Sequence, residues 1–316
     1  MRSVMTQSYR CLQIIAVDDG STDRSGMILD RLSQEDERIL VLHQENRGTA
    51  AARNSGLEAA VGTYLTFVDS DDYISPHYIK HFVRKMQESG ASLLICGARF
   101  VTEKGRVLKK LIPDSYVRFE AEEWPMRVSA VMGHFYRREL WTQSRLRFDE
   151  HREIMEDVAI SIYFAAVCDK IDVLPEAGYY YVMRKGSSTH QVRQRHPKGS
   201  SNRTLSLPYH SLENALKAVR DHGVVNSQEF HEIFVLRTLA VCAFDLSKKI
   251  DKAERRRLWR YICRIIRQYI PGSLHNRRAG LFADTRFPFV QRVGVCALLF
   301  LVRIHFLRAE NKHDRS

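Results

Sequence analysis

The sequence lacks the features that mark disulfide-rich, zinc-binding and membrane-spanning proteins. Its six cysteines lie far apart, with no CxxC pair and no histidine nearby at ligand spacing, which speaks against a disulfide framework or a zinc site and favours a reducing cytosol. The N-terminus MRSVMTQSYR has no apolar stretch of the signal-peptide kind, so we expect the protein to stay inside the cell. The longest apolar run, Val293 to Val302, is about half of the roughly 20 residues that a spanning helix needs, and we expect no membrane crossing.

Acidic residues are outnumbered, with 37 Asp+Glu against 49 Lys+Arg and a net charge of +12. Such an excess suits nucleic acid, anionic lipid or a phosphorylated substrate. The arginines concentrate towards the C-terminus and no recognised nucleic-acid motif is present, so we expect no nucleic-acid partner.

The first hundred residues or so alternate between apolar strands and amphipathic helices, a pattern that predicts an α/β fold with a mostly parallel sheet. A chain of 316 residues with 44% hydrophobic residues is long enough to bury a sizeable core. The predicted strands cover Gln13 to Val17, Ile39 to His43, Tyr64 to Val68 and Leu93 to Ala98. The predicted helices run from the turn after Asp23 to about Asp36, from Gly48 to Ala60, and onwards from Pro76.

The later sequence becomes increasingly helical. We expect an α/β domain over residues 1–190 and a helical, basic region over residues 191–316. Within the first, helices are predicted at Tyr136 to Gln143 and Glu156 to Val167, and a strand at Gly178 to Val182. Within the second, helices are predicted at Leu205 to Val219, Phe230 to Leu246 and Leu258 to Ile270.

Two acidic clusters follow predicted strands directly, at Asp18 to Asp23 and at Asp69 to Asp72. Ligands of open α/β sheets bind at the carboxyl ends of the strands, and converging carboxylates suit a hard metal ion and a polar ligand. Asp and Ser also favour turns and helix N-caps. That structural role suffices for the first cluster taken alone, whereas three carboxylates at Asp69 to Asp72 exceed what one cap requires.

The strings IIAVDDGSTDRSG and ENRGTAAARNSGLEAAVGTYLTFVDSDDYISP resemble the nucleotide-binding half of family 2 glycosyltransferases, and the resemblance continues more weakly to about residue 190. It implies the GT-A fold, a UDP-sugar donor and an inverting transfer onto a polysaccharide or lipid-linked acceptor. It further implies that Asp18 and Asp19 face the uracil and ribose, that Arg53 supports the nucleotide, that Asp69 lies near the ribose, and that Asp71 binds Mn²⁺ or Mg²⁺.

A sugar hydroxyl needs a general base to become a good nucleophile. The segments Phe148-Asp149-Glu150 and Met155-Glu156-Asp157-Val158 resemble the acceptor side of the family, which implies Asp157 as base with Glu156 as a supporting carboxylate. A helix N-terminus enriched in acids is the alternative. The segment Arg184 to His190 resembles the family's basic loop near the diphosphate, and a solvated charged loop is the alternative.

Two C-terminal segments combine apolar and basic residues, Leu258 to Ile270 and Phe287 to Leu307. Such helices suit the headgroup region of an anionic membrane, while packing against the rest of the protein is the alternative. For the second segment we favour the membrane. We therefore expect a cytoplasmic protein that is peripheral at the inner face of the plasma membrane.

The sequence departs from the family at its start. Residues Arg2 to Tyr9 resemble the end of a helix that the family places after an apolar first strand and a Pro-x-Tyr-Asn-like turn, and that strand is absent. A sheet without an internal strand has two unpaired edges. Either the start is misassigned, or the chain is a truncated, inactive nucleotide-sugar-binding protein.

Overall fold

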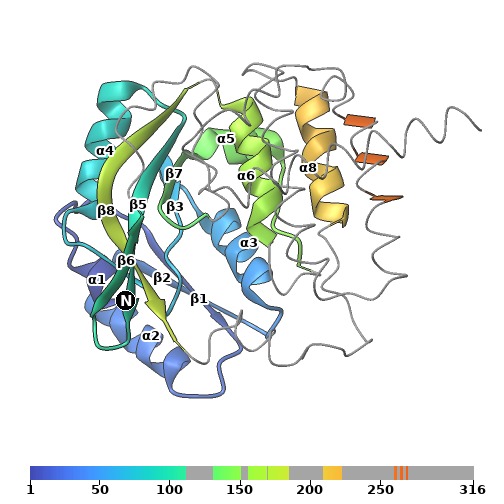
Figure 1. Ribbon diagram of the computed structural model, residues 1–316. Helices are drawn as coiled ribbons and strands as arrows, with labels where there is room; N and C mark the ends of the chain where they lie inside the picture. Colours follow the sequence, from blue (N-terminus) through green and yellow to red (C-terminus); the bar gives the residue numbers. More distant parts are fainter. Residues whose placement is uncertain are drawn as a thin grey trace, which may run out of the picture.

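The computed structural model describes residues 1–111, 131–150, 156–168, 170–184 and 209–222, together with 260, 261, 264, 265, 268 and 269. The strands are β1 (Ile14–Asp19), β2 (Ile39–Gln44), β3 (Tyr64–Thr66), β4 (Tyr73–Ile74), β5 (Leu93–Thr102), β6 (Val107–Leu111), β7 (His134–Arg137) and β8 (Ile171–Met183). The helices are α1 (Arg2–Met5), α2 (Ser25–Glu35), α3 (Thr49–Ala59), α4 (Tyr78–Ser89), α5 (Arg138–Ser144), α6 (Glu156–Val167) and α8 (Tyr209–His222) (Figure 1).

The strands pair in two groups. The parallel pair β1–β2 stands by itself, and the other strands form a six-stranded sheet in the order β3-β7-β5-β8-β4, with β6 paired to β5. Strands β5 and β8 are parallel, whereas β3–β7, β5–β7, β5–β6 and β4–β8 are antiparallel. Within the described part of the chain, β1 pairs with β2 alone and β3 with β7 alone, so each has one edge without a strand partner.

Helices cover both faces of the larger sheet, as two neighbouring residues of β7 show. Phe135 stacks on Phe82 of α4 with ring centroids 4.2 Å apart, while Tyr136 packs against Phe164 of α6 at 4.9 Å. Because successive side chains of a strand point to opposite faces, α4 and α6 lie on opposite sides, and α8 packs on α6 (Figure 1). The aromatic side chains of these layers are almost completely buried, so they supply much of the apolar area that stabilises the fold.

The predicted α/β fold is confirmed, with a mixed strand pairing: among the strands that the structure describes, β1–β2 and β5–β8 are the parallel pairs. One predicted element is wrong at its start: Tyr136 was expected in a helix and lies in β7, where it pairs with Leu65 and Leu93. The helix begins at Arg138. Burial of the Tyr136 ring between sheet and helix outweighs the helical spacing that the sequence shows.

The C-terminal predictions are described only in part. Helix α8 confirms a helix close to the predicted Leu205 to Val219. The segments Phe230 to Leu246 and Phe287 to Leu307 lie outside the described residues. Among the residues that are described, no helix is both long and apolar enough to cross a bilayer.

Candidate functional site

Asp18 and Asp19 end strand β1 and leave it on opposite faces. A Cβ atom on Gly26 of α2 would lie 2.7 Å from Oδ2 of Asp18, whereas one on Gly56 of α3 would lie 3.8 Å from Cγ2 of Val17. Asp18 therefore faces α2, and Asp19, two residues after Val17, faces α3. The two aspartates that sequence analysis assigns to one nucleotide thus have different surroundings.

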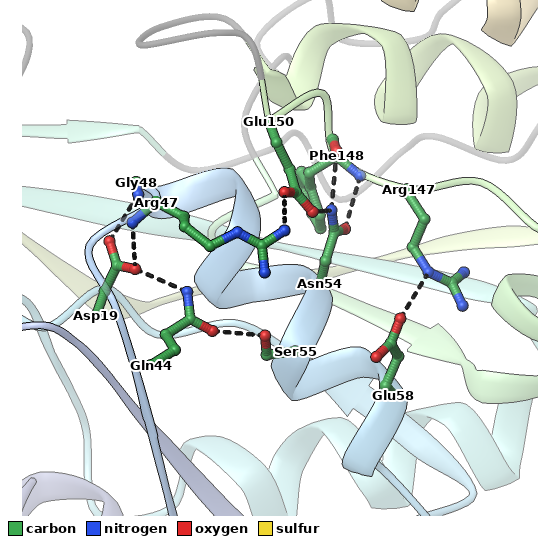
Figure 2. A network of polar contacts seen from close by, with 10 residues as sticks. All are labelled: Asp19, Gln44, Arg47, Gly48, Asn54, Ser55, Glu58, Arg147, Phe148 and Glu150. Atoms are coloured by element: carbon green, nitrogen blue, oxygen red, sulfur yellow. Dashed lines mark hydrogen bonds and ion pairs between the residues drawn. The ribbon is translucent and has the colours of Figure 1, made fainter.

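Asp19 organises the loop that leads into α3. Its carboxylate accepts hydrogen bonds from the backbone N–H groups of Arg47 (2.9 Å) and Gly48 (2.7 Å) and from Nε2 of Gln44 (2.7 Å). Ser55 of α3 in turn donates to Oε1 of Gln44 at 2.6 Å (Figure 2). Gly48 has φ +90°, a conformation that only glycine adopts without strain. The loop is thereby held at the carboxyl edge of β1 and β2.

Asp18 is buried and belongs to a charged triad with His43 and Asp30. Oδ1 of Asp18 accepts the backbone N–H of Ser21 at 3.0 Å, and Oδ2 lies 3.0 Å from Nδ1 of His43. The other ring nitrogen of His43 lies 2.9 Å from Oδ1 of Asp30. These hydrogen bonds, to Ser21 first and then to His43, lower the pKa of Asp18, and the carboxylates of Asp30 and Asp18 raise the pKa of His43.

Helix α3 carries the side chain that connects the N-terminal part of the fold to the segment at Phe148 and Glu150. Asn54 is buried and makes three hydrogen bonds: its Nδ2 donates to the Phe148 carbonyl (2.9 Å) and to Oε1 of Glu150 (3.0 Å), and its Oδ1 accepts the Phe148 N–H (2.9 Å). Glu150 also pairs with the guanidinium of Arg47 (Figure 2). The segment expected on the acceptor side is thereby fixed directly to the loop that Asp19 holds.

Arg53 is nearly buried and points its guanidinium at the acidic turn between β3 and β4. Its Nη2 donates to Oδ1 of Asp69 at 2.9 Å, and its guanidinium carbon lies 5.4 Å from the centre of the Phe148 ring. A guanidinium held in this way offers positive charge beside the carboxylates. The structure thus brings together Arg53 and Asp69, two residues that sequence analysis assigns separately to the nucleotide.

The last aspartate of the acidic turn, Asp72, is a structural anchor. Its Oδ1 accepts the backbone N–H of Val182 (2.8 Å) and its Oδ2 accepts the hydroxyl of Tyr179 (2.8 Å), while that hydroxyl oxygen accepts the backbone N–H of Asp69 (3.1 Å). The pKa of Asp72 is raised to about 7, chiefly by burial and also by the charges of Asp69 and Asp71, against the lowering effect of its hydrogen bonds. The turn is therefore fastened to β8 through Asp72, while the carboxylates of Asp69 and Asp71 pair with arginines.

Asp71, the expected metal ligand, pairs with Arg184 at the end of β8. Nη2 and Nε of Arg184 lie 2.6 and 3.2 Å from Oδ2 of Asp71. Among the described residues, no three His, Cys, Asp or Glu side chains come together as a ready metal site. One or two carboxylates are nevertheless enough for Mg²⁺ or Mn²⁺ when substrate phosphates complete the coordination, and the oxygen-only donors of Asp71 and Asp69 fit such an ion.

Asp157 lies in the first turn of α6 and is partly exposed. Burial raises the pKa of Tyr136 well above its usual range; the charge of Asp157 adds to the rise and that of Arg53 opposes it. Asp157 and Arg53 are thus within electrostatic reach of the same ring. Glu156 is the first residue of α6, and its side chain lies outside the described part.

Sequence reasoning missed the roles of Tyr179, Asn54 and His43 as supports of this site. Asn54 follows Arg53 in a helix that packs on the sheet, and a buried amide there is a signal that a partner exists. Tyr179 lies within a predicted strand, and nothing in its neighbourhood in the sequence indicates that its hydroxyl binds the acidic turn.

Acidic turns and arginines gathered beyond the ends of strands in an α/β fold are the kind of site at which such folds bind polar, phosphate-bearing ligands. The family described as "Glycosyl transferase family 2" matches residues 1–169. The chain therefore belongs to glycosyl transferase family 2. The match covers over half of the chain, including β1 to β7 and all the carboxylates that we assign to the site.

Individual proteins agree with this assignment. The chain is 34% identical over 199 residues to glycosyltransferase GlyA of Streptococcus pneumoniae. This match covers 58% of the present chain and 28% of GlyA. It is 32% identical over 198 residues to the uncharacterized glycosyltransferase EpsJ of Bacillus subtilis, covering 59% and 57% of the two chains. This chain thus matches less than two thirds of the length of either relative.

A solved structure confirms the fold. TarS 1–349 of S. aureus, in complex with UDP-GlcNAc, aligns with a TM-score of 0.67 at 18% identity over 98% of this chain and 86% of that chain. At that identity the likeness shows the fold alone, and it confirms the GT-A architecture.

Proposed function

We propose that this chain transfers a sugar from a UDP-sugar, bound with Mn²⁺ or Mg²⁺, to a glycan or lipid-linked acceptor, with inversion at the anomeric carbon. The observation that carries the proposal is the cluster of two ion pairs, Arg53–Asp69 and Arg184–Asp71, at one end of the sheet. It offers positive charge for a diphosphate and carboxylates for a metal in one place. The solved TarS complexes contain UDP and UDP-GlcNAc, which supports a uridine nucleotide as donor.

The proposed orientation of the donor follows from the side chains of α3, of the end of β1 and of the acidic turn between β3 and β4. Asp19 shares the α3 side of β1 with Arg53, so it is the aspartate that we assign to the base and ribose, together with Asp69. Asp18 contributes by holding the turn at Ser21 and by its pair with His43. A divalent cation on Asp71 would offset the charge that develops on the departing diphosphate.

The transfer step requires a base on the acceptor side. In the proposed reaction, Asp157 accepts the proton of the acceptor hydroxyl as the oxygen attacks the anomeric carbon from the face opposite the diphosphate. The bond from that carbon to the diphosphate oxygen breaks and UDP leaves. A single displacement of this kind inverts the configuration and needs one base. The ties of Asn54 and Arg47 to Glu150 support a fixed distance between donor and acceptor sides.

The acceptor side of the proposal includes a membrane. One relative, 26% identical over 207 residues, is named succinoglycan biosynthesis protein ExoO of Rhizobium meliloti, which supports synthesis of a cell-surface glycan on a lipid-linked or polysaccharide acceptor. We assign attachment to the inner face of the plasma membrane to the basic, apolar segments after residue 190, in line with the net charge of +12.

Calorimetric titration tests the donor assignment. We expect the purified chain to bind UDP in the presence of Mn²⁺, to bind it more weakly in EDTA, and to bind CDP and GDP more weakly than UDP. Equal affinity for the three diphosphates would contradict a uridine-specific site, and the absence of any UDP binding would contradict the donor altogether.

A further inference from the structure

The two ion pairs of the acidic turn differ in how firmly their arginines are held. The side chain of Arg53 is 11% exposed and lies against the Phe148 ring. The side chain of Arg184 is 44% exposed and follows the last residue of β8. An exposed ion pair contributes little to stability, because water competes for both partners. Arg184 can therefore leave Asp71 at small cost, whereas Arg53 is kept in place by its packing.

The guanidinium of Arg184 occupies one of the two oxygens that Asp71 could offer to a metal ion. Both of its hydrogen bonds reach the same oxygen, Oδ2 of Asp71. A divalent cation bound to that oxygen would lie close to the guanidinium and be repelled by it. A cation on the other oxygen of the same carboxylate would also lie near the guanidinium and compete with it for the charge of Asp71. Metal binding therefore weakens the pair and favours the departure of Arg184.

We infer that Arg184 is an exchangeable counter-ion of the site. In the nucleotide-free protein it neutralises Asp71, and when the metal arrives with the nucleotide it passes from Asp71 to the diphosphate. Asp71 then has a cationic partner in both states, and the displaced guanidinium finds a new anion in the diphosphate. This inference rests on the proposed function, because it takes the ligand to be a nucleoside diphosphate with a divalent cation.

Because of this exchange, the metal and the nucleotide should bind with positive cooperativity. A metal ion alone competes with Arg184 for Asp71 and offers the guanidinium no other anion, so it binds weakly. With the diphosphate present, the displaced guanidinium gains a new partner and the same displacement is favourable. By thermodynamic linkage, the metal must strengthen nucleotide binding by the same factor.

The substitution Arg184→Gln tests both roles of Arg184. It removes the cation that competes with the metal for Asp71, and it removes the cation that would bind the diphosphate. We expect the affinity for MnCl₂ alone to rise roughly two- to fivefold, as befits the loss of a competing, partly exposed ion pair. The affinity for UDP in saturating MnCl₂ should fall by about tenfold. Isothermal titration calorimetry measures both, and UMP, which lacks the second phosphate, should bind the variant and the wild type alike.

Two further variants serve as controls. Arg84→Gln removes one positive charge from an exposed ion pair with Glu88 on α4 and should change neither affinity. Arg184→Lys retains the charge without the planar fork of donors and should give values between those of the wild type and Arg184→Gln. Melting temperatures of all variants should stay near that of the wild type.

The outcomes distinguish this inference from the proposed function. If the wild type binds UDP with Mn²⁺ and Arg184→Gln leaves both affinities unchanged, or lowers both, the exchange is wrong and the donor assignment stands. If the wild type binds neither UDP nor UMP with Mn²⁺, both are wrong. Opposite changes in the two affinities, absent in Arg84→Gln, support the exchange.

Discussion

The link between α3 and the segment around Phe148 predicts a large and specific effect of the substitution Asn54→Ala. Asn54 is 7% exposed and Phe148 is 2% exposed, so water does not readily replace the lost hydrogen bonds. The substitution leaves the N–H and the carbonyl of Phe148 without the amide, and each such group costs about 1 to 3 kcal/mol. Two such groups lower the free energy of unfolding by about 2 to 6 kcal/mol, a substantial part of the roughly 5 to 15 kcal/mol typical of a domain.

The matched control is Glu58→Gln on the same helix. Glu58 pairs with Arg147, next to Phe148, across 3.9 Å, with the two side chains 69% and 46% exposed (Figure 2). An exposed pair of this kind contributes between about 0 and 1 kcal/mol, so its loss should scarcely change stability. Urea unfolding followed by circular dichroism measures both variants. Equal losses in the two, or a loss below about 1 kcal/mol for Asn54→Ala, would refute the argument from buried hydrogen bonds.

Three further predictions concern the metal, the charged triad and the membrane. Asp71→Asn keeps the shape and removes the charge, so transfer should fall by at least about tenfold; transfer as fast in EDTA as that of the wild type in Mn²⁺ would contradict the assignment. Both ring nitrogens of His43 face carboxylates, which raises its pKa from 6.5. Its stabilising effect should therefore be complete below that value and disappear as pH rises through the raised pKa. A thermal-melt series against pH should show this loss in the wild type and not in His43→Gln. Deleting the residues after Gln268 should release the protein from anionic vesicles in a sedimentation assay. The alternative, packing of these residues against the rest of the protein, would be supported if the intact chain did not sediment with vesicles and the deletion only lowered the melting temperature.

The parts of the fold that were predictable are those that local pattern determines. Strand β1, helix α3 and the acidic turn after β3 follow from apolar alternation, helical spacing and turn residues. The opposite directions of Asp18 and Asp19 also follow from the two-residue period of a strand. Tyr136 was misplaced because its helical spacing gave no sign of its pairing with Leu93.

The contacts that complete the site could not be predicted, because they join distant parts of the chain. Arg184 lies 113 residues from Asp71, and Tyr179 lies 107 residues from Asp72. The charge and type of a residue indicate which kind of group its side chain can bind. Which residue becomes its partner depends on which strand ends lie together in the folded sheet. The acidic turn could therefore be predicted from the sequence, whereas the pairing of Asp71 with Arg184 and of Asp72 with Tyr179 is visible only in the structure.

The most direct test of the central claim is the release of UDP from a UDP-sugar by the purified chain with Mn²⁺ and an acceptor extracted from membranes, measured beside the variant Asp157→Asn. We predict that the wild type releases UDP and forms a glycosylated product of inverted configuration. Asp157→Asn should bind UDP with unchanged affinity in calorimetry and form little product, because only proton transfer is lost. No UDP release by the wild type with any UDP-sugar, or a parallel loss of UDP affinity and turnover in Asp157→Asn, would contradict the account.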